Sequence, residues 1–359
     1  MSQYAQAIID LNALVHNLAM VRRCAPSSQM MAVVKANAYG HGLMPIVKAM
    51  AEQVDGFALS SVPEASQVRA MGNRNRLLVL TGCRSVDEVQ QASEQELDLV
   101  IHHAAQLDCL ESATFSRPLH LWIKIDTGMH RLGFLPEQIE FVRDRLARLK
   151  TKVASVRLMS HLANGDDLQD SKTAEQTSLF EQCELSHDME RSLANSAGIL
   201  GWPQTHYQWV RPGLMLYGVS PFVNRVGEQD GLKPVMQLQT CLIAIKSLRK
   251  GDAVGYGGSW RCPEAMQLGV AAIGYADGFP RHLVKPVQLS LNGRPVPLVG
   301  RVSMDLVTLD LRQHADAKIG DTLICWGAGV PVETIADAAG TIPYELLCKV
   351  TPRVAFRYQ

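Results

Sequence analysis

The sequence lacks a net charge, a long apolar run and a recognisable leader segment. Lys plus Arg and Asp plus Glu are balanced at 35 residues each, so the formal net charge is zero. Neither nucleic acid nor an anionic membrane surface is therefore indicated as a partner. No apolar run approaches the roughly 18 residues of a membrane-spanning helix. The first residues contain no basic segment followed by an apolar core. We expect a protein that is neither secreted nor bound to a membrane.

The eight cysteines show no paired spacing. None belongs to a Cys-x-x-Cys motif, and they stand singly at Cys24, Cys83, Cys109, Cys183, Cys241, Cys262, Cys325 and Cys348. Isolated cysteines are typical of reduced thiols in the cytoplasm and indicate neither a disulfide framework nor a metal site. We predict a cytoplasmic protein without a bound metal.

Length and pattern predict two domains. The chain of 359 residues exceeds the size at which a single hydrophobic core usually stops growing. In residues 1–232, apolar segments alternate with helical periodicities, among them 11–24, Pro63–Met71 and Pro136–Leu149. The eight candidate strands are Met31–Lys35, Gly56–Ser60, Leu77–Thr81, Leu97–Ile101, Leu119–Ile125, Val156–Ser160, Ser192–Ser196 and Leu214–Gly218. This alternation predicts an α/β fold, a (β/α)8 TIM-type barrel. A doubly wound open sheet is the alternative, although no Gly-x-Gly-x-x-Gly motif follows any of these strands.

The pattern changes to mainly β from about Lys233. Helical periodicity is confined to residues 332–339, and Asn292-Gly293 is a typical hairpin turn. The strand-like segments are Thr240–Leu248, Leu268–Gly274, Val287–Leu291, Leu306–Leu311 and Thr322–Trp326. We predict a mainly β C-terminal domain over residues 233–359.

Lys35 ends an apolar strand, an unusual place for a lysine. Met31–Val34 are four apolar residues in a row, and Tyr39 follows in a glycine-flanked segment. Burial lowers the pKa of an amine and makes it nucleophilic, which suits covalent chemistry with an aldehyde. A strand-end lysine that extends its ammonium to water is the structural alternative, and this pattern alone does not separate the two.

The segment around Lys35 resembles the pyridoxal-phosphate attachment motif of bacterial alanine racemases. Similar blocks recur in the family's order along almost the whole chain. The nine blocks are Met31–Gly42, Lys124–Gly133, Met159–His161, Ala194–Ala197, Val210–Leu214, Val254–Gly257, Gly274–Gly278, Gly300–Asp305 and Tyr344–Leu346. The resemblance implies a barrel that binds pyridoxal 5'-phosphate, followed by a β-domain that meets the partner subunit of a homodimer.

The resemblance also implies roles for individual residues. Lys35 would hold the cofactor covalently and act as a base on one face of the substrate. Tyr256 of the partner subunit would be the second base, since a racemase must exchange a proton on both faces. Arg211 would donate to the pyridine nitrogen, because a guanidinium can only donate. The cofactor phosphate would be bound by Tyr39, Ser196, Gly213, Leu214 and Tyr344.

Further residues would bind and orient the substrates, L-alanine and D-alanine. Arg131 would contact the substrate carboxylate and the phenolic oxygen of the cofactor. Lys124 would be carbamylated and orient Arg131, and His161 would orient Tyr256 or Arg211. Tyr275 and Met304 would narrow the pocket, and Asp305 would support them. D-alanine would be made for peptidoglycan or broken down.

Other interpretations stay open from the residues alone. Tyr39 and Tyr256 could be turn aromatics, Arg211 a surface arginine and His161 a core residue. The alternative functions are a barrel-type pyridoxal-phosphate-dependent amino-acid decarboxylase and a noncatalytic carrier of the cofactor. Arg211 and Tyr256 argue against the decarboxylase, and the long second domain argues against the carrier.

Overall fold

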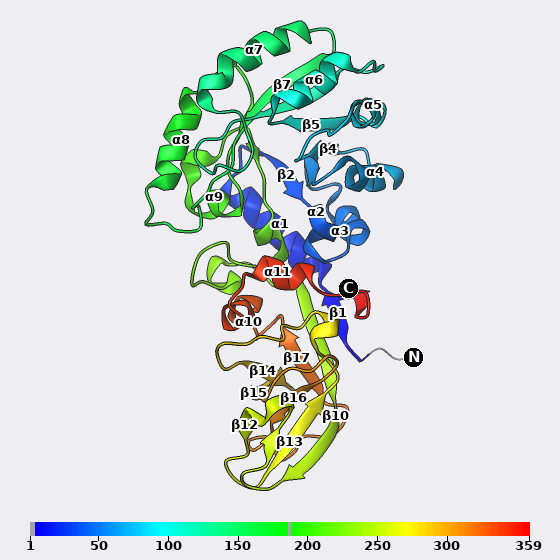
Figure 1. Cartoon of the computed structure of the whole chain (residues 1–359), viewed down its shortest axis with the longest axis vertical. Coiled ribbons are helices and arrows are strands. Elements are labelled where there is room, and N and C mark those ends of the chain that lie inside the picture. Colours follow the sequence, from blue (N-terminus) through cyan, green and yellow to red (C-terminus); the bar gives the residue numbers. More distant parts are fainter. Residues whose placement is uncertain (1–3, 186–187) are drawn as a thin grey trace.

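The first part of the chain is a closed barrel of eight parallel strands surrounded by helices (Figure 1). The computed structural model describes residues 4–185 and 188–359; residues 1–3 and 186–187 of the predicted barrel domain lie outside the described residues. In barrel order the strands are β2 (Gln29–Val33), β3 (Gly56–Leu59), β4 (Arg76–Val79), β5 (Leu97–Ile101), β6 (Leu119–Lys124), β7 (Val153–Met159), β8 (Arg191–Ser192) and β9 (Trp209–Val210). Their continuous apolar stretches fit strands that are covered on both faces, and the prediction of a TIM-type barrel is confirmed.

Capping side chains fix where several barrel helices begin. Asp10 accepts hydrogen bonds from the backbone N–H groups of Asn12 and Ala13, at 2.8 and 2.9 Å. Ser61 and Ser85 cap two further helices in the same way. The helices are α1 (Leu11–Cys24), α2 (Lys35–Tyr39), α3 (Leu43–Met50), α4 (Val62–Ala70), α5 (Val86–Glu94), α6 (Ala104–Ser112), α7 (Ile139–Arg148), α8 (Lys172–Gln182) and α9 (Ser196–Gly201).

The last two predicted barrel strands were placed wrongly. Leu214–Tyr217 is a 3-10 helix, and the eighth strand is β9, which lies earlier in the chain. The seventh strand contains only Arg191–Ser192, and Ser196 begins α9. The segment Leu214–Tyr217 is wholly buried, and a short buried apolar run has the same pattern in a strand as in a helix.

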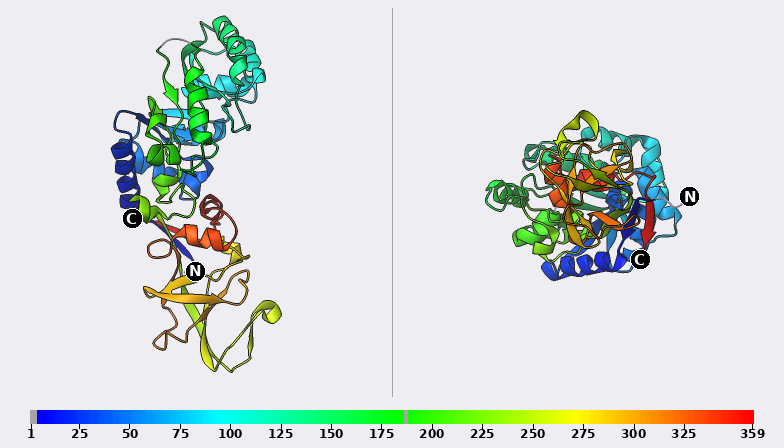
Figure 2. Two further views of the ribbon diagram at one scale, coloured as in Figure 1. Left: turned by 90° about the vertical axis from the view of Figure 1, so that its left-hand side faces the viewer. Right: turned by 90° about the horizontal axis from the view of Figure 1, so that it is seen from below.

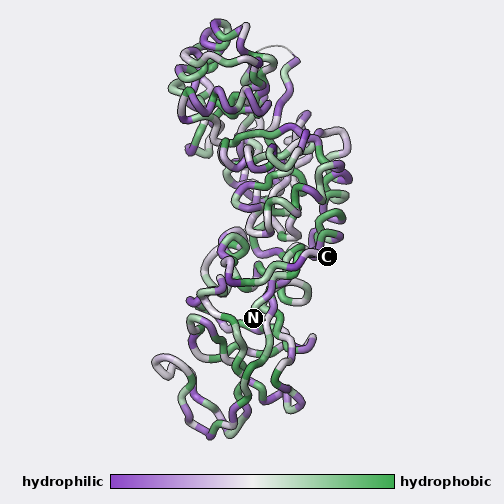
Figure 3. Tube along the Cα trace, turned by 90° about the vertical axis from the view of Figure 1, so that its right-hand side faces the viewer, coloured by the Kyte–Doolittle hydropathy of each residue, from purple (hydrophilic) through white to green (hydrophobic). Residues whose placement is uncertain are grey.

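The second domain is built on an eight-stranded sheet around the long strand β10 (Met236–Leu248). The other strands of this sheet are β1 (Gln6–Ile9), β13 (Met266–Ala271), β14 (Gln288–Leu291), β15 (Arg294–Val299), β16 (Val307–Asp310), β17 (Thr322–Trp326) and β18 (Ala355–Tyr358). β11 (Ala253–Val254) and β12 (Trp260–Arg261) form a separate hairpin. Hydrophobic residues run along the strands of both domains (Figure 3).

The two ends of the chain meet in the second sheet. β1 pairs with β10 in the antiparallel direction and with β18 in the parallel direction, and the described ends lie close together in Figure 2. The strand at residues 6–9 therefore belongs to the C-terminal sheet, although the sequence placed residues 1–232 in the barrel domain. Within the ranges 4–185 and 188–359, no helix has the length and apolar character needed to cross a membrane.

Two helices of the second domain lie at its junction with the barrel (Figure 1): α10 (Val332–Ala338) and α11 (Pro343–Cys348). α11 contacts α2, the segment that begins at Lys35. A Cβ atom on Gly40 would lie 2.1 Å from the carbonyl oxygen of Leu347, and the φ of Gly40 is +80°. Only glycine permits this approach. The second domain thus supports the end of β2.

Candidate active site

A cavity of about 550 Å³ opens at the carboxyl ends of the barrel strands. Lys124 and Met159 are the last residues of β6 and β7, and Lys35 lies just beyond β2. This is the end at which barrel enzymes carry their chemistry. The cavity brings together ten of the predicted site residues: Lys35, Tyr39, Lys124, Arg131, His161, Ser196, Arg211, Gly213, Leu214 and Tyr344.

Lys35 and Tyr39 are presented to the cavity by α2, which is a left-handed turn and not a regular α-helix. The four residues from Ala36 to Tyr39 have φ values of 53, 56, 54 and 51°. This conformation costs a non-glycine residue about 1–2 kcal/mol. Glu64 opposes the strain, since its carboxylate accepts hydrogen bonds from the backbone N–H groups of Ala36 (3.0 Å) and Ser60 (2.7 Å). Glu64 belongs to none of the nine blocks that resemble the family, and its contact with the turn was not predicted.

Both lysines in the cavity favour the neutral amine more than a free lysine does. Burial lowers the pKa of Lys35, and the charge of Arg131 lowers it further, while Glu64 opposes the change. Burial and then Arg211 and Arg131 lower the pKa of Lys124 to about 8. A neutral amine is the form that attacks a carbonyl group or takes up carbon dioxide.

Tyr39 and the Gly213 segment form a compact wall of the cavity. The Tyr39 ring stacks on Tyr217 with 4.8 Å between centroids, and burial raises its pKa, so its hydroxyl stays protonated. The Ser196 hydroxyl accepts hydrogen bonds from the N–H groups of Gly213 and Met215, at 3.0 and 3.2 Å. A Cβ on Gly213 would lie 2.7 Å from the Tyr39 hydroxyl. Because Ser196 Oγ accepts both amide N–H groups, its own O–H is left to donate, and it lies with the Tyr39 hydroxyl at a wall where an anion can be bound.

Arg211 is a buried guanidinium without a carboxylate partner among the described residues. Its Nη1 donates to the Ser192 hydroxyl at 2.5 Å, and its Nη2 donates to the carbonyl oxygens of Ser160 (2.6 Å) and Leu193 (3.2 Å). Burial lowers its pKa to about 10, which still leaves it charged at pH 7. Burial, followed by the charge of Arg211, lowers the pKa of His161 and keeps that ring neutral. Ser192 and Ser160 belong to this support, and their roles were missed.

The loop that carries Arg131 is organised by Asp126. One carboxylate oxygen of Asp126 accepts hydrogen bonds from the N–H groups of Gly128, Met129 and His130, at 2.9, 3.0 and 3.0 Å. Burial alone would raise the pKa of Asp126, but these N–H groups outweigh it and the pKa is lowered. Asp126 lies in the block Lys124–Gly133, but no role was predicted for it.

We expect Asp126→Ala to lower the free energy of unfolding by about 2 kcal/mol at neutral pH, because three backbone donors lose their acceptor. The folded pKa of Asp126 lies below its unfolded value, so this contribution is present above the unfolded pKa of about 3.9 and is lost as pH falls through the folded pKa. Urea unfolding of the wild type and the variant measures the difference. Asp126→Asn, which keeps one acceptor, should lose less. A difference that stays the same at neutral and strongly acidic pH would contradict this role.

Four predicted residues are not brought into this cavity by the single chain. Tyr256 and Met304 are 68 and 52% exposed, and Tyr275 is 38% exposed. Asp305 forms an ion pair with Arg353 at 2.6 Å. All four lie in the C-terminal domain, and none lines the cavity with Lys35. The exposed side chains of Tyr256, Met304 and Tyr275 are available to another molecule.

Comparisons with known proteins agree over the whole chain. The family model "Alanine racemase, N-terminal domain" matches residues 9–221, and "Alanine racemase, C-terminal domain" matches residues 235–358. The alanine racemase of Nitrosococcus oceani is 51% identical over 98% of each chain, and that of Shewanella loihica is 46% identical over 99% of each chain.

Solved structures show the same agreement. The biosynthetic alanine racemase of Pseudomonas aeruginosa superimposes with a TM-score of 0.95 at 42% identity, with both chains covered fully. The alanine racemase of Bartonella henselae, which carries covalently bound pyridoxal phosphate, superimposes with a TM-score of 0.89 at 28% identity, again with both chains covered fully. By sequence and by fold, the chain belongs to the alanine racemase family.

Proposed function

We propose that this protein interconverts L-alanine and D-alanine by a two-base mechanism, with pyridoxal phosphate bound at Lys35 and with Tyr256 supplied by a partner subunit. The observation that carries the proposal is the division of the predicted site. One chain assembles the cofactor-binding residues around Lys35 and leaves Tyr256 exposed on the other domain. Family membership favours this activity over the decarboxylase and carrier alternatives.

The residues of the cavity fit pyridoxal phosphate. Lys35 offers an amine of lowered pKa for covalent attachment to its aldehyde. The hydroxyls of Tyr39 and Ser196 would provide donors for its phosphate, beside Gly213, where a larger residue than glycine would fill the space. Arg211 provides an unpaired charge for its ring nitrogen. The bound cofactor would supply an electron sink that makes the α-proton of the amino acid acidic.

The two bases act from opposite sides of the substrate α-carbon. Lys35, as a neutral amine, removes or returns the proton on one face. The Tyr256 hydroxyl does the same on the other face, because a single base cannot reach both sides of a planar centre. Exchange of the proton between these faces inverts the configuration.

Arg211 and Arg131 hold the reacting groups in place. Arg211 can only donate a hydrogen bond, so it disfavours protonation of a ring nitrogen beside it. Its three anchoring oxygens fix its plane. Arg131 offers a planar fork that can bind both oxygens of the substrate carboxylate.

We expect Lys124 to be carbamylated, because its pKa of about 8 leaves a larger neutral fraction than usual. The resulting anion would pair with the Arg131 guanidinium beside it. Lys124→Ala should lower activity by about 10²-fold, as for a lost positioning charge, and short carboxylates added to the assay should restore part of it. Mass spectrometry under carbon dioxide trapping should find the carbamate on Lys124 of the wild type. A variant that is indifferent to carboxylates, with no trapped adduct in the wild type, would exclude this role.

The direct test of the proposed activity is incubation of the holoenzyme with L-alanine in deuterated buffer. Racemisation gives D-alanine with deuterium at the α-carbon and releases no carbon dioxide. Release of carbon dioxide with formation of an amine would support the decarboxylase instead. The cytoplasmic location and the role in making or degrading D-alanine stay predictions.

A further inference from the structure

A second cavity lies at the opposite end of the barrel. It has a volume of about 360 Å³ and is lined by the first residues of three neighbouring strands. Arg76 begins β4, and Asp98 and His120 are the second residues of β5 and β6. Lys124 ends the same strand β6 at the catalytic cavity. We call this second space the floor cavity, and the proposed racemase site makes no use of it.

The charged groups that line the floor cavity are mainly positive. They are Arg69, Arg74, Arg76 and Arg117, against the carboxylates Glu96 and Asp98. Burial lowers the pKa of His120, so that its ring is neutral at pH 7. The lining therefore carries an excess of two positive charges.

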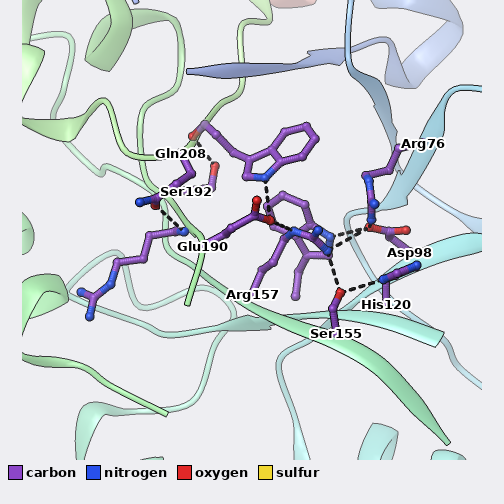
Figure 4. Close-up of polar contacts among 11 residues, drawn as sticks. Arg76, Asp98, His120, Ser155, Arg157, Glu190, Ser192 and Gln208 are labelled. Atoms are coloured by element: carbon purple, nitrogen blue, oxygen red, sulfur yellow. Dashed lines mark hydrogen bonds and ion pairs between the residues drawn. The ribbon is translucent and has the colours of Figure 1, made fainter. Parts of the chain in front are cut away.

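Asp98 pairs with Arg76 on the inner side of the floor cavity, while Arg157, the other guanidinium near Asp98, pairs with Glu190. Arg76 Nη1 donates to Asp98 Oδ2 at 2.6 Å, and Trp122 Nε1 donates to the same oxygen at 2.8 Å. The excess of two positive charges therefore comes from Arg69, Arg74 and Arg117, against Glu96. Arg157 lies 4.0 Å from Asp98 Oδ2 on the inner side. Figure 4 shows Asp98 between Arg76 and Arg157, and His120 joined to Arg157 through Ser155.

The remaining arginines are held at the cavity without a strong anionic partner. Arg69 is fixed by carbonyl oxygens, among them Gln95 at 2.8 Å. Arg117 pairs with Glu96 at the surface, where both side chains are more than half exposed and such pairs contribute little. Arg74 lines the floor cavity and has no ion pair or hydrogen bond with the residues in 4–185 and 188–359. Burial lowers the pKa of Arg69, and the nearby charge of Arg74 lowers it further.

We propose that the floor cavity binds a small phosphate-bearing anion, held by Arg74 and Arg117 at the rim and by Arg76 within. Planar guanidinium groups engage phosphate oxygens in pairs, and this makes arginine the preferred residue for such ligands. An anion would relieve the repulsion between Arg69 and Arg74. The ligand could be a free phosphate or diphosphate, or the same group on a nucleotide.

The test uses calorimetric titration of the holoenzyme, in which the cofactor phosphate fills the catalytic site. Pyrophosphate is the first probe and ADP is the second, and a response to ADP alone would assign the site to nucleotides. Arg74→Gln combined with Arg117→Gln should weaken binding by at least about tenfold. The matched control combines Arg148→Gln with Arg249→Gln, which removes two exposed arginines elsewhere and changes the net charge equally.

The proposal is supported if the control binds pyrophosphate or ADP as the wild type does while the floor-cavity variant does not. Racemase activity should be unchanged in both double variants, which shows that they are folded. Equal weakening in both variants would show a net-charge effect and overturn the proposal. Absence of saturable binding of either probe to the wild type at millimolar concentration would overturn it as well.

Discussion

Lys35→Ala should abolish racemisation almost completely, with a loss in kcat of more than about 10⁴-fold. The variant would lose both the covalent anchor of the cofactor and one of the two bases, and general-base catalysis alone contributes about 10²–10⁴-fold. Steady-state assays in both directions measure the loss. Because both directions use Lys35 on one face, L-alanine and D-alanine should be affected alike.

Lys48→Ala is the matched control, since Lys48 is an exposed lysine on the neighbouring helix α3. It should keep wild-type activity. Borohydride reduction of the wild-type holoenzyme followed by peptide mapping should place the pyridoxyl group on Lys35. A label on Lys124, the other lysine of the cavity, would show that the assignment of Lys35 is wrong.

Arg211→Glu should slow racemisation by about 10²–10³-fold, the range expected when one fixed electrostatic group is removed. A carboxylate in this place would accept a hydrogen bond from a protonated ring nitrogen, whereas the guanidinium opposes protonation of that nitrogen. We therefore expect a new long-wavelength absorbance during turnover, which stopped-flow spectroscopy would record. Wild-type rates with no new absorbance would refute the electronic role.

Ser192→Ala provides the control for this substitution. It removes the hydrogen bond from Arg211 Nη1 but keeps the guanidinium and its two other anchoring oxygens. Activity should fall by less than about tenfold, which is the cost of one hydrogen bond of about 1 kcal/mol. No long-wavelength absorbance should appear. The pair of variants separates the charge of Arg211 from its exact placement.

The parts of the fold that sequence could predict are those with a distinct local pattern of apolar residues. β5, β17 and α1 were placed at their observed bounds. β9 was missed because it has only two residues and precedes a buried apolar run that mimics a strand. β1 and β18 were missed because each is a short strand whose partner is distant in sequence, at the opposite end of the chain. Local periodicity carries no information about such pairing.

The site also contains residues that the sequence could predict and residues that it could not. Residues in distinctive blocks, such as Lys35 and Arg211, could be named from the resemblance and lie together in the cavity. The role of Glu64 could not be named, because it depends on the left-handed turn over Ala36–Tyr39, which the sequence of that segment does not reveal. Tyr256 does not line the cavity around Lys35 in the single chain, and its predicted role as the second base requires a second chain.

In the proposed function, each active site takes Lys35 from one subunit and Tyr256 from the other. Homodimers of Lys35→Ala and of Tyr256→Phe should each be nearly inactive. When the two variants are mixed by refolding, random pairing makes about half of the dimers hybrids, and each hybrid has one site with both bases. The activity of the mixture should recover to about a quarter of the wild-type value. Sites formed within single chains would give no recovery, and that result would contradict the account.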